Sequence, residues 1–143
     1  MASKTKQQGF TIVELLIVIV VIGILALLVI TTFTGIQKKA RDTERTTDIK
    51  AIHSQLEAYY AQKSAYPALA EVTTTTLKGL DADALVAPNP IGTFDASAAT
   101  IAKYQYVTSP VGCTTAANDC TSYVLSYVLE ETPTVTTTKN SLN

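Results

Sequence analysis

The residues of this sequence that could do chemistry are few and far apart. Glu14 is a single carboxylate inside an otherwise apolar segment, His53 is the only histidine, and Cys113 and Cys120 are the only cysteines. Catalysis needs several such groups brought together, as in a metal cluster or a nucleophile beside its base. No phosphate-binding loop or nucleophile motif accompanies them. The sequence therefore predicts no enzyme, no cofactor and no metal, with His53 on a helix surface.

The two cysteines indicate a small disulfide. Neither a Cys-x-x-Cys pair nor a nearby histidine suggests that Cys113 and Cys120 bind zinc. A bridge that closes so short a loop contributes roughly 2 to 3 kcal/mol in the loop-entropy model. Two buried free thiols are the alternative, but both residues fall in one predicted exposed loop, which favours the bridge and an oxidising compartment.

The bulk composition argues against a nucleic-acid partner. The chain has 143 residues and a formal net charge of -1, with 16% charged and 47% hydrophobic residues, so it has no basic stripe.

Asp81, Asp83 and Asp95 lack the Asp-x-Asp-x-Asp-Gly order of a calcium loop and are expected to be solvated. After residue 67 about 75 residues remain, a core small enough to need a staple, a helix or an assembly partner.

Glu14 must be positioned by the apolar segment around it. Residues 15–30 are apolar without exception, and the 21 residues from 10 to 30 suffice for about 30 Å of helix, the thickness of a bilayer core. No small-x-small cleavage site follows, so we expect this segment to remain in the protein and span the membrane. An ionised carboxylate there costs on the order of 2 to 3 kcal/mol, so Glu14 needs a partner or a position at the headgroups.

The residues around Glu14 carry a resemblance to a known family. They are Lys4, Thr5, Lys6, Gln7, Gln8 and Gly9, followed by Phe10, Thr11, Ile12, Val13, Glu14, Leu15 and Leu16. This string resembles the leader and mature start of type IV prepilins, in which a membrane aspartyl peptidase cuts after the glycine and methylates the new N-terminus. The resemblance implies a leader at residues 1–9, a cut between Gly9 and Phe10, and N-methylation of Phe10.

By the same resemblance, Glu14 is the helix carboxylate that pairs with the N-terminal amine of another subunit and sets the register of assembly. A buried carboxylate that faces a buried ammonium is far less costly than either alone. The implied partners are related pilin subunits in a helical filament, the prepilin peptidase, and an inner-membrane platform driven by a cytoplasmic ATPase.

The implied location is a single pass through the cytoplasmic membrane, followed by a cell-surface filament. The basic residues just past the apolar run favour the opposite orientation, because they outnumber the lysines of the leader. The cysteines and the threonine-rich stretches nevertheless place the bulk of the chain outside.

The helix is expected to continue past the membrane segment to about residue 63. Apolar residues recur there mostly at steps of three and four, at Ile36, Ala40, Ile49, Ile52, Leu56, Tyr59 and Tyr60. This half resembles pilins and secretion pseudopilins that carry Ala-Arg-Asp, a later arginine, Asp-hydrophobic and Tyr-Pro, here at residues 40–42, 45, 48–49 and 66–67. Two interpretations stay open, a solvated helix face or charges that meet neighbouring subunits, for Arg41, Asp42, Arg45 and Asp48.

The remaining residues are expected to form a small head. Alternation at period two predicts strands at residues 101–109 and 122–130, whose tyrosines and leucines pack on Ile52, Leu56 and Tyr59. A short helix is expected near residues 81–86. The predicted fold class is α+β, a long N-terminal helix packed against a small antiparallel sheet. The expected divisions are residues 1–9 (leader), 10–35 (membrane helix), 36–66 (outer helix), 67–131 (head) and 132–143 (flexible tail).

The predicted function is that of a structural subunit of a type IV pilus-like filament. The alternatives are a minor pilin or pseudopilin of a secretion or DNA-uptake system, and a permanently anchored extracellular binding module. Adhesion, motility, secretion and DNA uptake all use this architecture in the family, so the sequence predicts the class of assembly rather than its task.

Overall fold

The computed structural model describes residues 9–88 and 92–143. The expected leader, residues 1–9, lies outside the described residues except for Gly9, as do residues 89–91 of the loop before the sheet. The chain divides into two compact units, Met1–Gln37 and Lys38–Asn143. Each unit is described by itself below.

One helix, α1 (Ile12–Lys63), contributes residues to both units. The helix was expected from residue 10 to about residue 63. The observed helix begins two residues later and ends at the expected residue, so the prediction is confirmed. Ser64 then adopts a left-handed conformation with φ of 60°, and its amide donates to the Tyr60 carbonyl at 2.7 Å. A left-handed residue after the last turn is a common way to end a helix, so the chain can turn back toward the sheet at this point.

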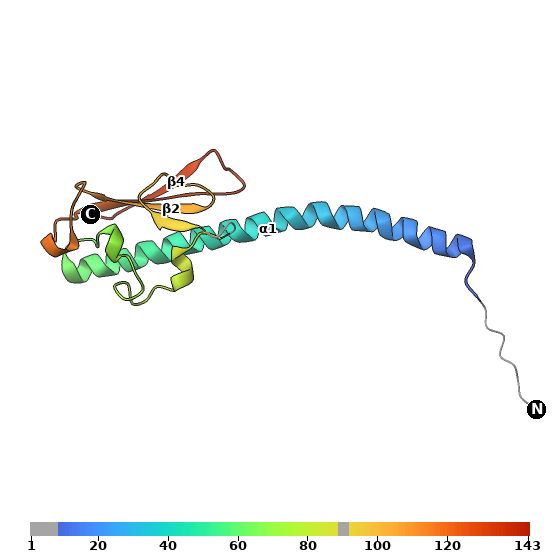
Figure 1. Ribbon diagram of the computed structural model, residues 1–143, viewed down its shortest axis with the longest axis horizontal. Helices are drawn as coiled ribbons and strands as arrows, with labels where there is room; N and C mark the ends of the chain where they lie inside the picture. Colours follow the sequence, from blue (N-terminus) through green and yellow to red (C-terminus); the bar gives the residue numbers. More distant parts are fainter. Residues whose placement is uncertain (1–8, 89–91) are drawn as a thin grey trace, which may run out of the picture. The chain divides into compact units, whose positions relative to one another are not determined.

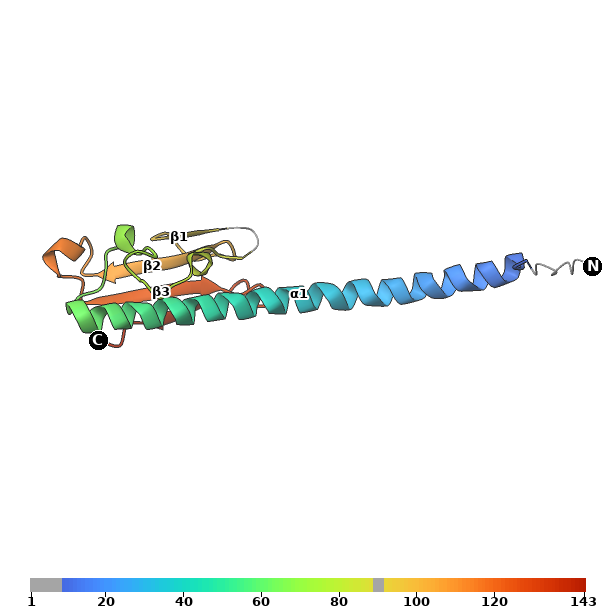
Figure 2. The ribbon, with the colours of Figure 1, turned by 90° about the horizontal axis from the view of Figure 1, so that it is seen from below.

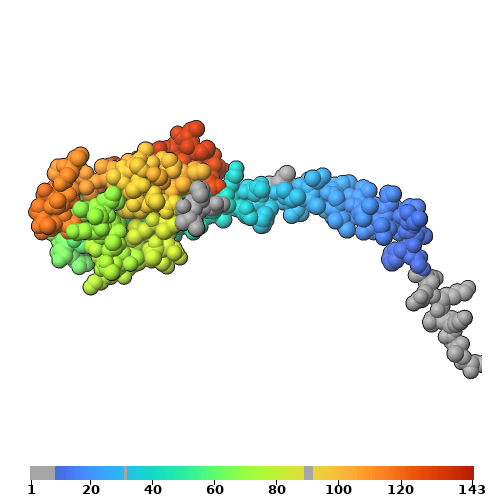
Figure 3. All heavy atoms as spheres, viewed as in Figure 1, coloured from blue at the N-terminus to red at the C-terminus, as the bar shows by residue number. Residues whose placement is uncertain are grey.

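In the first unit α1 presents apolar side chains on every side. All the described apolar residues from 10 to 36 are exposed, and Figure 3 shows this segment in blue and cyan. A window of α1 has a mean hydropathy of 3.4, so the helix is long and apolar enough to cross a membrane by length and composition. Such a surface is not stable in water unless hydrocarbon or protein covers it.

The second unit packs α1 against one face of a four-stranded sheet (Figures 1 and 2). The strands are β1 (Thr93–Asp95), β2 (Lys103–Ser109), β3 (Ser122–Val128) and β4 (Thr136–Asn140), in that order across the sheet. β2, β3 and β4 are antiparallel, which confirms the predicted hairpin of β2 and β3. The predicted α+β fold, a long helix packed on a small sheet, is confirmed; β1 is parallel to β2, so the sheet is mixed rather than antiparallel throughout.

The flexible tail predicted at residues 132–143 is also wrong, because β4 forms within it. Leu125 pairs with Lys139 and Tyr127 with Thr137 along the edge of β3. Threonine is β-branched and favours an extended backbone, so the Thr-rich run can supply an edge strand although it is polar.

The core of the second unit lies between α1 and the inner face of β2 and β3. Tyr104 and Tyr106 of β2 and Tyr123, Leu125 and Tyr127 of β3 are buried, as the alternation predicted. They cluster with Ile52 and Leu56 of α1, with Tyr59 packed against the cluster. The Tyr106 hydroxyl donates to the Pro67 carbonyl at 2.8 Å, so the core also holds the segment that follows the helix.

Three short 3-10 helices complete the head: η1 (Leu69–Glu71), η2 (Ala82–Leu85) and η3 (Thr115–Ala117). η2 lies where a short helix was expected, and Asp81 caps it by accepting a bond from the Asp83 amide. The loops therefore carry defined turns rather than long elements, as their glycines, prolines and threonines indicated.

Candidate functional site

Thr11 and Glu14 form a capping box at the start of α1. The Glu14 amide donates to the Thr11 hydroxyl oxygen at 3.2 Å, and the Thr11 amide donates to Glu14 Oε2 at 2.9 Å. The Thr11 hydroxyl donates to the same carboxylate oxygen at 2.7 Å. This reciprocal arrangement satisfies amides that a helix start leaves without partners. The helix therefore begins at Ile12, and Gly9, Phe10 and Thr11 lie outside it.

The capping box gives Glu14 partners inside its own chain, which the sequence analysis did not foresee. The Thr-x-x-Glu pattern before an apolar run is a signature of this cap, so the signal was present. A carboxylate that moves from water into an apolar setting loses its hydrogen bonds to water. The hydrogen bonds from Thr11 replace some of these and so lower the free-energy cost of placing Glu14 there. Phe10 and Gly9, the expected cleavage residues, are both exposed.

Asp42 holds the connection that follows β3 against α1. Its carboxylate accepts hydrogen bonds from the backbone amides of Glu130 and Glu131, at 2.8 and 3.0 Å. Arg41 binds the Glu130 side chain with two parallel bonds of 2.7 and 2.6 Å, the bidentate geometry typical of strong arginine-carboxylate pairs. The Arg41 guanidinium lowers the pKa of Glu130 to about 2.

Arg45 lies at the centre of this charge cluster, with no exposed surface on its side chain. It pairs with Asp42 at 3.0 Å and with Glu130 at 2.9 Å. Its guanidinium also donates to the backbone oxygens of Pro88 and Ile101, at 2.6 and 2.9 Å. One arginine thus connects α1 with the segments that precede and follow β1.

Asp48 faces the sheet two turns nearer the end of α1 than Arg41. Its carboxylate accepts a 2.8 Å bond from the hydroxyl of Tyr104. Burial raises the pKa of Asp48 to about 6, helped by the nearby charges of Glu44 and Asp83 and opposed by the Tyr104 bond and by Arg45.

The four charged residues of the helix motif therefore all bind groups within their own subunit; they are Arg41, Asp42, Arg45 and Asp48. Asp42 and Arg45 are buried, so the interpretation as a solvated helix face is wrong for these two residues. Each of them can be buried because it has several hydrogen-bond or ion-pair partners in the head. A role of these charges between subunits stays a prediction. The sequence analysis missed Glu130, for which no local pattern gives a signal.

His53 is half-buried rather than a surface residue, because it packs beside the sheet. Its Nδ1 lies 2.6 Å from the hydroxyl of Tyr123, which donates to Glu57 at 2.9 Å. Burial and the charge of Lys139 lower the pKa of His53. Tyr66 also donates to Glu57, at 3.0 Å, so this network ties α1 to β3 and to the segment after the helix.

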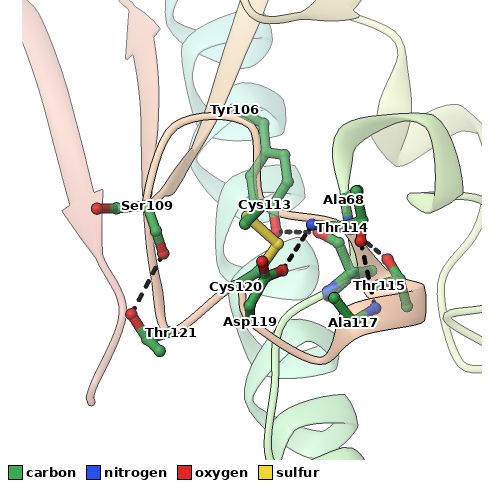
Figure 4. Close-up of a disulfide and its surroundings, with 11 residues drawn as sticks. Ala68, Tyr106, Ser109, Cys113, Thr114, Thr115, Ala117, Asp119, Cys120 and Thr121 are labelled. Carbon is green, nitrogen blue, oxygen red and sulfur yellow. Dashed lines mark hydrogen bonds between the residues drawn. A yellow bond between two sulfur atoms is a disulfide. The ribbon is translucent and has the colours of Figure 1, made fainter.

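Cys113 and Cys120 form the predicted disulfide in the connection between β2 and β3 (Figure 4). Asp119 lies close to both sulfurs, but these atoms are bonded to each other, and a thiolate rather than a disulfide sulfur binds metal. The Asp119 carboxylate instead accepts the Thr114 amide at 2.7 Å. In Figure 4 the Thr115 hydroxyl meets the Ala68 amide, a 2.7 Å bond that joins the loop to the segment after α1.

The model of a family described as "Prokaryotic N-terminal methylation motif" matches residues 4–30. The type II secretion system core protein G of Dickeya chrysanthemi is 40% identical over 79 residues, which are 55% of this chain and 47% of that protein. The corresponding protein of Vibrio cholerae is 37% identical over 90 residues, 63% of this chain and 57% of that protein.

A type IV pilin is similar over a shorter stretch. The type IV major pilin protein PilA of Myxococcus xanthus is 34% identical over 61 residues, 43% of this chain and 28% of that protein. These matches support the family of type IV pilins and type II secretion pseudopilins for this chain. No solved structure gives a significant match.

The chain spans about half the length of these curated type II secretion relatives. Its apolar helix and its methylation motif fit a membrane-anchored subunit. The resemblance stated from the sequence is therefore confirmed at the level of the family.

Proposed function

We propose that this chain is a structural, non-enzymatic subunit of a filament of the type IV pilus or type II pseudopilus kind. The observation that carries the proposal is the exposed apolar surface of the first unit, most of which lies within the methylation motif at residues 4–30. Hydrocarbon can cover this surface in the membrane, and like helices can cover it in a filament. The exchange is nearly neutral for apolar groups, so a motor can move the helix from one to the other.

In this proposal the peptidase removes residues 1–9 by cutting between Gly9 and Phe10, and the new amine of Phe10 is methylated. The capping box supports this site, because it leaves the bond between Gly9 and Phe10 outside the helix. Residues 10–35 then span the cytoplasmic membrane, and an inner-membrane platform with its ATPase transfers them to the filament. The second unit, from residue 38 on, forms the extracellular head.

Glu14 has two successive partners in this account. In the single subunit the carboxylate is held by Thr11. During assembly it accepts the N-terminal ammonium of another subunit, a partner of opposite charge that the cap does not supply. A buried ion pair is favourable only in good geometry, so the pair selects the correct register among packed apolar helices.

The relatives favour a pseudopilus over a motility pilus, because the type II secretion proteins match this chain at higher identity and over more residues than the pilin does. We therefore propose secretion as the first task to test for the filament.

The variant Glu14→Gln tests the role of the charge. Glutamine keeps an oxygen that can accept the Thr11 amide, so the helix cap, membrane insertion and leader removal are expected to be unchanged. The charge is lost, so fibres counted by electron microscopy should fall to near zero. Glu71→Gln, the same change at an exposed residue of η1, should leave fibre number unchanged. Normal fibres from Glu14→Gln would contradict the proposed pairing.

A further inference from the structure

Acidic side chains gather on one flank of α1 in the second unit. Glu44 and Asp48 lie one helical turn apart, and the charges of Glu44 and of Asp83 in η2 both act on Asp48. Glu44 and Asp83 are exposed, and within residues 9–88 and 92–143 neither forms an ion pair. This acidic flank, defined as Glu44, Asp48 and Asp83, therefore carries exposed negative charge at Glu44 and Asp83 that no ion pair within the described ranges neutralises.

A basic groove lies on another flank of the same helix. It has a volume of about 260 Å³ and lies between α1 and the connection after β3, with Lys39 and Lys50 in its lining. Both lysines are exposed, and neither pairs with a carboxylate in the described part of the chain. The lining also includes Asp42, which already binds Arg45, and Glu131. Two ammonium groups against the Glu131 carboxylate leave the groove positive.

The acidic flank and the basic groove face different directions. At 3.6 residues per turn, Lys39 and Lys50 lie within about 20° of each other around the helix axis, and Glu44 lies about 140° from Lys39. Figure 1 agrees, because the segment around η2, in yellow-green, lies on one side of α1 and the connection between β3 and β4, in red, lies on the other. One subunit therefore cannot bring its own two charged surfaces together.

We propose that the acidic flank of one copy of this chain docks on the basic groove of the next copy. This inference rests on the proposed function and adds a second contact, between heads, to the packing of the apolar helices. The two surfaces are complementary in charge and different from each other, so each copy keeps one free surface after docking. Such a head-to-tail contact can continue from copy to copy, and it gives an open filament where the rotation between copies does not close a ring.

Cysteine cross-linking tests the contact directly. The native cysteines are bonded to each other, so a chain with both Lys50→Cys and Asp83→Cys carries two new thiols that they do not compete for. In cells that make the fibre, mild oxidation should give a ladder of covalent dimers, trimers and longer species. Chains with either substitution alone should stay monomeric. A product that stops at dimers, or no product at all, would overturn the head-to-tail contact; the latter is expected if the groove binds lipid headgroups instead.

Charge reversal gives an independent test. Lys39→Glu with Lys50→Glu puts like charges in contact and should lower fibre yield by about tenfold. Adding Glu44→Lys and Asp83→Lys to the same chain should restore it. Lys63→Glu with Lys78→Glu makes the same change in net charge outside the groove and should assemble normally.

The results separate the two proposals. If the unaltered chain keeps its leader and forms no fibres, the proposed function fails. If it forms fibres and the reversal of Lys39 and Lys50 has no effect, or the combined reversal does not restore yield, only the head contact is wrong. A control pair at Lys63 and Lys78 that is equally defective would also count against the contact, because the effect would then follow net charge alone.

Discussion

Asp48 keeps a half-buried carboxylate beside Tyr104, and the fold disfavours its charged form. Its pKa in the folded protein is about 6, above the ordinary value of 3.8. A carboxyl with a raised pKa adds stability while it is protonated. This contribution is complete below the ordinary pKa and is lost as the pH rises through about 6.

The variant Asp48→Asn should therefore be more stable than the unaltered chain at neutral pH. Asparagine keeps an oxygen that can accept the Tyr104 bond, but it has no charge to bury. Thermal unfolding of the full chain in detergent should show a Tm that falls between about pH 4 and pH 6, and a smaller fall in the variant. Glu71→Gln controls for the loss of one exposed charge. An identical pH profile for Asp48→Asn and the unaltered chain would contradict this account.

Arg45 shows what a buried charge requires. Replacing it with methionine leaves the carboxylates of Asp42 and Glu130 without their central partner, and breaking such a buried pair costs about 3 to 5 kcal/mol. Denaturant unfolding should show this loss for Arg45→Met. Arg41→Met removes a more exposed partner of Glu130 and should cost less than Arg45→Met. Equal losses for the two variants would show that burial does not set the cost.

The position of Arg45 could have been predicted from the sequence more closely than it was. Residues 42, 45, 49, 52 and 56 follow steps of three and four, so Asp42 and Arg45 extend the buried stripe of Ile49, Ile52 and Leu56. Periodicity counted over apolar residues alone leaves them out. Their partner Glu130 is distant in sequence, and only the folded chain brings it near.

At the level of the elements, the disulfide staples the connection between β2 and β3. Its loop holds the segment after α1 through the bond from the Ala68 amide to Thr115. Replacing both Cys113 and Cys120 with serine should lower the free energy of unfolding by roughly 2 to 3 kcal/mol, because the unfolded chain regains loop entropy. Chemical denaturation under oxidising conditions measures this loss. Reducing agent should destabilise the unaltered chain and leave the double variant unchanged.

The sheet shows which elements the sequence predicts. β2 and β3 were predicted because large side chains recur there at every second position, at Tyr104 and Tyr106 in β2 and at Tyr123, Leu125 and Tyr127 in β3. β1 has three residues and none of them is buried, so it gave no periodic signal. β4 is a threonine-rich edge strand, and its polarity suggested a mobile tail. Lys139 on the β4 edge helps to prevent pairing with a further strand, which is a common use of lysine there.

At the scale of the whole molecule, the two units meet different physical demands. The first presents apolar side chains all round and depends on lipid or on other copies for cover. The second has its own core, in which Arg45 and Cys120 are fully buried. The long apolar helix of the first unit was predictable because its length and hydropathy are both read directly from the sequence. The capping of Glu14 was less so, because its carboxylate also fitted the ion pair expected from the family resemblance.

The central claim is that cleavage between Gly9 and Phe10 creates the amine that Glu14 of another copy accepts. Mass spectrometry of the protein recovered from fibres tests it most directly. The account predicts a chain that begins at Phe10 and is heavier by one methyl group. Fibres built from chains that still carry residues 1–9 would contradict it, because the N-terminal ammonium would then lie nine residues away from the helix start.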